Sequence, residues 1–126
     1  MKIIIISIFG VAGVLSRYLV GIFSTKYFES QTLGTFLVNI IGGLIVGCAY
    51  SLLNEKDILS PDLQSGIFIG FLGGFTTFSA YYLDIIKLIE NNSLKEALLL
   101  FILCPVLGLL AAAGSLLLTK SLLSVR

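Results

Sequence analysis

Long runs of apolar residues alternate with short polar segments along the whole chain. Four such runs cover residues 3–23, 32–53, 62–89 and 97–118. Each is close to or above the about 20 residues that an α-helix needs to cross a bilayer. The polar segments between the runs are short and leave no room for a soluble domain. The pattern therefore predicts an all-α membrane protein, with four transmembrane helices in one integral membrane domain over residues 1–126.

The centre of the third apolar run is a poor helix former. Gly73 and Gly74 are adjacent, and Thr76 and Thr77 follow almost at once. Glycine weakens a helix, and β-branched threonine adds little to it. In a membrane such a break persists only where an ion or another buried chain uses the freed backbone groups. We therefore expect a third helix that is broken mid-membrane at residues 73–77, with a tight glycine packing face as the simpler alternative.

The composition supports the membrane assignment and excludes several classes of function. Hydrophobic residues make up 57% of the chain and charged residues only 12%, whereas soluble domains carry about 25% charged residues. A net charge of +1 predicts no nucleic-acid-binding surface, and the lack of histidine argues against histidine-based catalysis or metal binding. Cys48 and Cys104 lie far apart in apolar runs, so they are interpreted as small buried residues.

Few polar side chains fall inside the apolar runs. None is a carboxylate at mid-span, which argues against a small multidrug-type proton antiporter, the main alternative for four spans of this length. No nucleophile–base pair is present, so the chain is not expected to be an enzyme. Hydroxyls, an amide and aromatic ring edges present partial positive charge, which suits the passage of a small anion without tight binding. These side chains are Ser16, Arg17, Asn39, Thr76, Thr77, Ser79, Tyr81 and Tyr82.

Two of these polar residues allow more than one interpretation. Arg17 lies toward the end of the first run, so its side chain either extends to the headgroups or places a fixed positive charge at the mouth of an anion path. Asn39 either links two helices through hydrogen bonds or lines a pore as a donor. Gly43 and Gly47 in the same run predict a close helix crossing without indicating a function.

Three motifs, in chain order, resemble the CrcB/Fluc fluoride-channel family. They are Gly10-x-x-Gly13-x-x-x-Arg17-Tyr18, Gly34-Thr35-x-x-x-Asn39-x-x-Gly42 and Gly70-Phe-Leu-Gly-Gly-Phe-Thr-Thr-Phe-Ser-x-Tyr81. Each motif is weak alone, but together they cover three of the four spans at family-like spacing. The resemblance implies a fluoride-selective ion channel in the cell inner membrane that exports F⁻ passively and gives fluoride resistance.

The resemblance also implies an architecture and a set of site residues. It implies an antiparallel, dual-topology dimer with two pores along the subunit interface. A structural Na⁺ would lie at the dimer centre, and by position its ligands would be the backbone carbonyls of Gly73 and Thr76. The anion pathway would include Asn39, Phe78, Ser79, Tyr81 and Arg17.

The chain departs from the family pattern in two places. Tyr81 stands where the family has a second phenylalanine, and Ala80 stands where it has a threonine. The fourth span has Phe101, Cys104 and Pro105 in a region where many members carry a tyrosine and serines. These departures favour a heterodimer with a paired similar subunit, whereas a homodimer that tolerates the substitutions is the alternative.

Positive charge does not select an orientation in the membrane. Four spans place both termini on one side, with four of the eight Lys and Arg residues, and the other four lie on the opposite side. The positive-inside rule, which orients a protein by its excess of Lys and Arg on one side, therefore favours neither orientation. We expect either insertion in both orientations or an orientation set by a small bias and a partner.

Overall fold

The computed structural model describes residues 1–56 and 59–124, and these contain helices and no β-strand. The elements are α1 (Lys2–Phe28), α2 (Gln31–Lys56), α3 (Pro61–Ser65), the π-helical stretch η1 (Gly66–Leu72), α4 (Gly73–Phe75), α5 (Phe78–Glu90) and α6 (Leu94–Ser124). Four segments are long and apolar enough to cross a membrane, namely Lys2–Phe28, Gln31–Leu53, Pro61–Glu90 and Leu94–Ser124. The predicted all-α class with four membrane-spanning helices is therefore confirmed.

The third span begins at a conventional helix start. The Ser60 hydroxyl accepts a hydrogen bond from the Leu63 N–H at 3.4 Å. Pro61 occupies the first helical position, where its missing N–H leaves no hydrogen bond unmade. Helical backbone then continues through η1 and α4 to Phe75.

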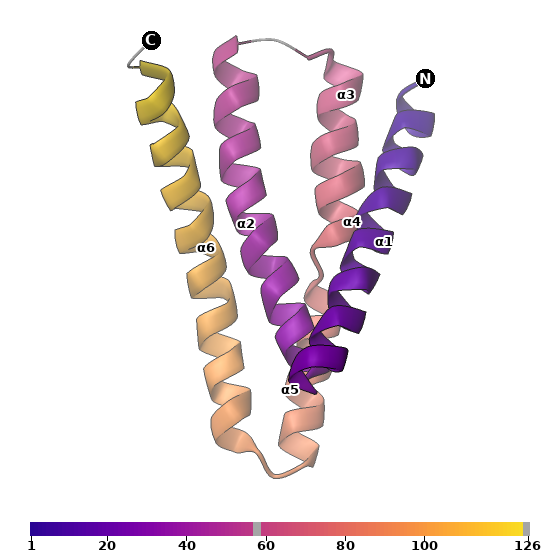
Figure 1. Ribbon diagram of the computed structural model, residues 1–126, viewed down its shortest axis with the longest axis vertical. Coiled ribbons are helices and arrows are strands. Elements are labelled where there is room, and N and C mark those ends of the chain that lie inside the picture. Colours follow the sequence, from indigo (N-terminus) through magenta and orange to yellow (C-terminus); the bar gives the residue numbers. More distant parts are fainter. Residues whose placement is uncertain (57–58, 125–126) are drawn as a thin grey trace.

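The third span changes conformation at Thr76 and Thr77, which are extended and separate α4 from α5 (Figure 1). This extended segment is shorter than the expected interval 73–77, because the two glycines remain helical. A Cβ atom on Gly74 would lie 2.7 Å from the carbonyl oxygen of Gly10 in α1. Helix packing therefore accounts for Gly74, and the threonines alone make the change of conformation.

Helices α2 and α6 pack closely through small residues. A Cβ atom on Gly43 would collide with the carbonyl oxygen of Gly108. A Cβ atom on Gly47 would collide with the carbonyl oxygen of Ala112 and the hydroxyl of Ser115. The two glycines thus form the close crossing that their spacing predicted.

Helix α1 packs on η1 and α4 in the same way. A Cβ atom on Gly13 would collide with the carbonyl oxygen of Phe71 and lie 2.9 Å from the backbone nitrogen of Phe75. A Cβ atom on Gly70 would lie 2.6 Å from the carbonyl oxygen of Ile6. These contacts hold α1 beside the extended segment of the third span.

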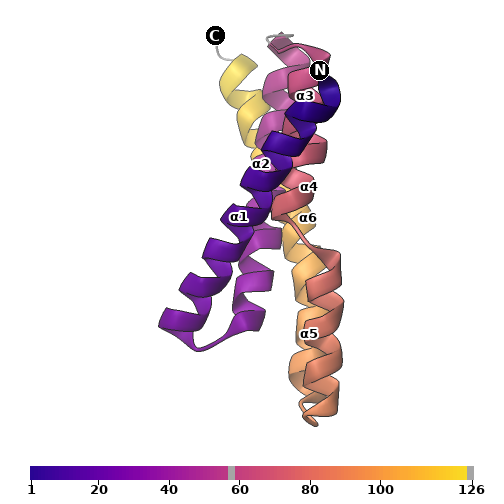
Figure 2. The same cartoon turned by 90° about the vertical axis from the view of Figure 1, so that its right-hand side faces the viewer.

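The four spans form two hairpins that separate at one end. Figure 1 shows both chain termini at the same end of the molecule, as an even number of spans requires. In the side view, α1 and the start of α2 diverge from α5 and the start of α6 toward the opposite end (Figure 2). The divergence opens next to Thr76 and Thr77, so the extended segment lies where the two hairpins part.

The close contact of α2 with α6 predicts a specific loss of stability. Gly47→Ala is expected to lower the free energy of unfolding by about 1–3 kcal/mol, because the added methyl group collides with backbone atoms that cannot rotate away. Gly114→Ala is the matched control, since no atom beyond its chain neighbours and the nearby backbone of its own helix lies within 4 Å of that added methyl. Thermal unfolding in detergent, followed by circular dichroism, measures both variants. Equal effects of the two substitutions would contradict the packing argument.

Candidate functional site

The site is built around the two extended threonines. Thr76 has φ −78° and ψ 159°, and Thr77 has φ −153° and ψ 122°. The Thr76 N–H still bonds the Leu72 carbonyl at 3.0 Å, so α4 ends with its last hydrogen bond made. The Thr77 hydroxyl accepts a hydrogen bond from the Ala80 N–H at 3.2 Å and thereby caps α5. Thr76 therefore ends α4, and Thr77 begins α5.

Asn39 on α2 pairs with the backbone of Thr77 through both ends of its carboxamide. The Thr77 N–H donates to Asn39 Oδ1 at 2.9 Å, and Asn39 Nδ2 donates to the Thr77 carbonyl at 3.0 Å. The side chain thus supplies the donor and the acceptor that a neighbouring strand would supply. Each group would cost roughly several kcal/mol if it were left unpaired at this depth. Both interpretations of Asn39 remain open, but a helix-linking role is now visible.

The second N–H of the Asn39 amide faces a weak acceptor. Asn39 Nδ2 lies 3.7 Å from Cys104 Sγ on α6. A thiol sulfur accepts hydrogen bonds poorly compared with an oxygen. This N–H is consequently the least well satisfied hydrogen of the amide and the one that an anion could take over.

The pairing of Asn39 with Thr77 also frees a carbonyl group. In a continuous helix the Thr77 N–H would bond the Gly73 carbonyl, but here it bonds Asn39 instead. Gly73 is exposed on the surface of the subunit. The Thr76 carbonyl is partly used, because Arg17 Nη1 on α1 donates to it at 3.1 Å. The carbonyls of Gly73 and Thr76 are thus oxygen acceptors at the end of α4.

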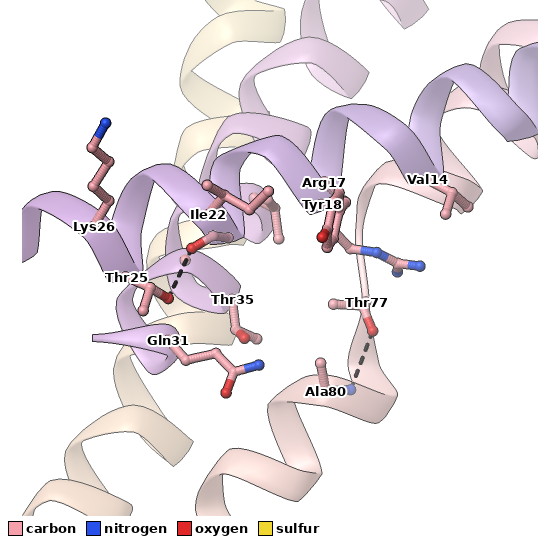
Figure 3. Close-up of a pocket in the computed structure, with 13 residues that line it drawn as sticks. Val14, Arg17, Tyr18, Ile22, Thr25, Lys26, Gln31, Thr35, Thr77 and Ala80 are labelled. Carbon is pink, nitrogen blue, oxygen red and sulfur yellow. Dashed lines mark hydrogen bonds between the residues drawn. The ribbon is translucent and has the colours of Figure 1, made fainter. Parts of the chain in front are cut away.

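Arg17 lies beside a cavity of about 660 Å³ in the space where the hairpins part. In Figure 3 the Arg17 side chain extends toward the segment that carries Thr77, whereas Lys26 on the same helix points away from the cavity. Thr35 and Gln31 on α2 contribute further polar groups to the lining. Arg17 thus places a positive charge at the cavity, and none of the described residues that line the cavity is a carboxylate, so the cavity favours an anion.

A second cavity, of about 460 Å³, lies along α2, α5 and α6. Asn39, Phe78 and Tyr81 line it together with Cys104 and Pro105. Gly73 and Thr76, the proposed carbonyl ligands, line it as well. This cavity therefore brings together five of the predicted site residues, namely Asn39, Gly73, Thr76, Phe78 and Tyr81.

The two cavities share no lining residue, yet neighbouring residues line one or the other. Val38 lines the first and Asn39 the second, and Thr77 lines the first and Thr76 the second. The wall between the cavities is accordingly made by the Asn39–Thr77 pair and the start of α5. Ser79 lines neither cavity, and its hydroxyl lies 3.1 Å from the Thr77 hydroxyl.

The aromatic residues of α5 differ in their surroundings. The Phe78 side chain is 65% exposed, whereas Tyr81 is 2% exposed and packs with Leu100 and Cys104. The two rings meet edge to face, with centroids 5.8 Å apart and planes at 87°. The Tyr81 hydroxyl donates to the Phe101 carbonyl on α6 at 2.8 Å. Phe78 therefore lies on the surface of the chain, while Tyr81 belongs to its interior.

Cys104 and Thr77 take part in the site through contacts that were not predicted from the sequence. Cys104, interpreted as a small buried residue and as a departure from the family pattern in the fourth span, faces the Asn39 amide. Thr77 holds both the pairing with Asn39 and the cap of α5, a role that its position just before a helix could have indicated. Outside both cavities, Asp84 is buried on α5, and its Oδ2 atom has no hydrogen-bond partner in the described part of the chain.

The comparisons with known proteins agree with the predicted resemblance. The chain matches the family described as "CrcB-like protein, Camphor Resistance (CrcB)" over residues 4–116. A protein named "Fluoride-specific ion channel FluC" from Pseudomonas syringae pv. tomato is 36% identical over 122 residues, which cover 94% of this chain and 96% of that protein. Its namesake from Pseudomonas putida is 36% identical over 112 residues, with coverage of 88% and 90%.

A relative from Bacillus cereus is named "Fluoride-specific ion channel FluC 1" and is 34% identical over 112 residues, which cover 88% of this chain and 81% of that protein. The family match extends over all four membrane-spanning segments. The protein is thus a multi-pass membrane protein, and it belongs to the CrcB family.

Proposed function

We propose that this chain is a subunit of a fluoride-selective ion channel that lets F⁻ leave the cytoplasm passively and so relieves fluoride toxicity. The relatives named as fluoride-specific channels support the choice of ion. The observation that carries the proposal is the wall between the two cavities, where hydrogen-bond donors and ring edges gather around Asn39 and Thr77. Such a path needs no chemical step, so the protein acts as a channel and not as an enzyme.

The donors along this path are suited to a small, strongly hydrated anion. Arg17 draws anions into the first cavity, although its guanidinium is already engaged with the Thr76 carbonyl. The Asn39 N–H that faces Cys104 exchanges a weak acceptor for fluoride. The edges of Phe78 and Tyr81 follow in the second cavity. Neutral donors hold the ion without a strong ion pair, as conduction requires.

A second, antiparallel copy would complete the path. Gly73 and Phe78 are exposed on a surface that lies at membrane depth. Exposed backbone acceptors are costly in contact with lipid, which supports a protein partner over this face. The partner is either another copy of this chain or a paired similar subunit. The heterodimer is supported by α6, which places Cys104 and Pro105 along the second cavity in place of hydroxyl side chains.

The oxygen acceptors at the end of α4 fit a structural Na⁺ at the centre of such a dimer. The carbonyl of Gly73 has lost the donor that a continuous helix would provide, and that of Thr76 retains one lone pair beside its bond to Arg17. Neutral backbone oxygens are ligands suited to a hard cation. Two carbonyls from one subunit are a partial shell, so the partner would supply the remainder. When bound, Na⁺ would tie the two subunits together at their extended segments.

The direct test is fluoride efflux from liposomes that contain this chain alone, measured with a fluoride electrode and with chloride as the comparison ion. We expect rapid efflux of fluoride with little efflux of chloride if a homodimer suffices. If well-folded protein gives no fluoride efflux alone but gives efflux after co-reconstitution with a paired subunit, the active form is the heterodimer. Proton-coupled efflux of a lipophilic cation, without fluoride flux, would contradict the proposal.

Asn39→Asp is expected to abolish fluoride efflux. The change places a negative charge in the path and removes the donor to the Thr77 carbonyl. Asn91→Asp is the matched control, because Asn91 lies at the exposed end of α5 outside both cavities. Size-exclusion profiles of the two variants establish that both fold. Wild-type efflux in Asn39→Asp would remove Asn39 from the anion path.

Phe78→Ile is expected to reduce fluoride efflux, because isoleucine has no aromatic edge to present to the ion. Phe23→Ile provides the comparison, since Phe23 on α1 is similarly exposed (52%) and lines neither cavity. Initial efflux rates at equal protein content measure the effect. If both variants retain the wild-type rate, Phe78 has no part in permeation.

A further inference from the structure

We infer that Pro105 is a positioning residue for Tyr81: because proline lacks an N–H, it leaves the Phe101 carbonyl to the Tyr81 hydroxyl. This bond fixes the ring of Tyr81 at the second cavity and withholds its hydroxyl hydrogen from the anion. The effect on the anion rests on the proposed function. The effect of Pro105 on the bond between Tyr81 and Phe101 concerns only the fold of the chain and holds whatever the ion is.

The hydrogen bonding of α6 requires an outside donor at Phe101. In an α-helix each N–H donates to the carbonyl four residues earlier, so the residue at 105 should serve the carbonyl of Phe101. Pro105 has no N–H to donate, and it lies inside the uninterrupted helix Leu94–Ser124. The Phe101 carbonyl is therefore left without its helical donor in an apolar environment.

The Tyr81 hydroxyl is that donor. Tyr81 lies on α5, faces α6 and donates to the Phe101 carbonyl at 2.8 Å. Tyr81 is only 2% exposed, so bulk water is not an alternative partner for its hydroxyl. The bond satisfies both the buried hydroxyl of Tyr81 and the carbonyl of Phe101, which has no helical donor because residue 105 is proline. A hydroxyl placed at random on α5 would have no reason to meet this particular carbonyl.

The same bond determines what Tyr81 can offer to an anion. Tyr81, Cys104 and Pro105 line one cavity with Asn39. A hydroxyl has one hydrogen, and here it points to the Phe101 carbonyl. Tyr81 consequently lines the cavity with its hydroxyl hydrogen already engaged, and its hydroxyl does not act as a strong anion donor.

The fold half of the inference is tested by a double-mutant cycle on thermal stability in detergent. Tyr81→Phe is expected to lower the melting temperature in the parent chain, because the Phe101 carbonyl loses its donor. In the Pro105→Ala chain the restored N–H serves that carbonyl, so adding Tyr81→Phe should cost markedly less. Additive shifts would overturn the inference. Pro105→Gly restores the same N–H and repeats the cycle if the alanine variant does not fold.

Tyr82→Phe is the matched control in both backgrounds. Tyr82 neighbours Tyr81 on α5 but is 54% exposed, and its hydroxyl makes no hydrogen bond within the described residues. It should give the same small shift with or without Pro105. A dependence of the Tyr82→Phe shift on Pro105 would show that the proline acts through general disruption of α6 and would also overturn the inference.

The anion half is tested by the dependence of efflux rate on fluoride concentration. Pro105→Ala gives the Phe101 carbonyl a second donor that competes with the Tyr81 hydroxyl, so this hydroxyl becomes more available to the anion and fluoride should half-saturate the efflux at a lower concentration. Tyr81→Phe in the same chain should return that concentration toward the parent value. An unchanged half-saturating concentration in Pro105→Ala overturns this half. Absence of fluoride efflux from every variant and from the parent instead contradicts the proposed function, and the stability cycle still reports the bond.

Discussion

The pairing of the Asn39 carboxamide with the Thr77 backbone is the interaction on which the site depends. An extended residue at membrane depth exposes an N–H and a carbonyl that water cannot reach, and one side chain on a neighbouring helix satisfies both. The extended segment is therefore maintained by Asn39 of α2 together with the Thr77 hydroxyl that caps α5. Helix α2 is in turn held in place by its glycine contacts with α6.

Several properties of the site follow from that pairing. The Thr77 N–H bonds Asn39, so the Gly73 carbonyl is left without the donor that a continuous helix would give it. The Thr77 hydroxyl takes no part in this pairing and caps α5. The break also leaves the Thr76 carbonyl open to Arg17 on α1. One amide thus sets where a helix ends, where the next begins and which oxygens are available between them. The extended conformation of residues 76–77, the free carbonyl of Gly73 and the wall between the cavities are physically a single arrangement.

The fold was predictable from the sequence to the extent that the bilayer constrains it. Apolar runs of sufficient length can only be spanning helices, and the spacing of Gly43 and Gly47 indicated where two helices cross. The extent of the break was not predictable, because Gly74 has two possible uses. Its packing against α1 depends on tertiary contacts that no local propensity reveals.

The site was predictable in its residues but not in its connections. Asn39 and Tyr81 stood out as polar groups in apolar runs, yet their partners lie on other helices and follow from the packing. One such connection has a local signal, since a proline within a helix implies an unpaired carbonyl four residues earlier. For Pro105 this carbonyl is that of Phe101, but the sequence does not indicate that Tyr81 is the residue that donates to it.

The bond between Tyr81 and the Phe101 carbonyl also bears on how this sequence can change over generations. Replacing the tyrosine alone leaves the Phe101 carbonyl without a donor, whereas replacing the proline restores the helical N–H to that carbonyl. The tyrosine is therefore retained for as long as the proline is present, independently of any benefit to permeation. The effect of changing one position depends on the residue at the other, so the order in which the two residues can change is set by the apolar interior of the subunit.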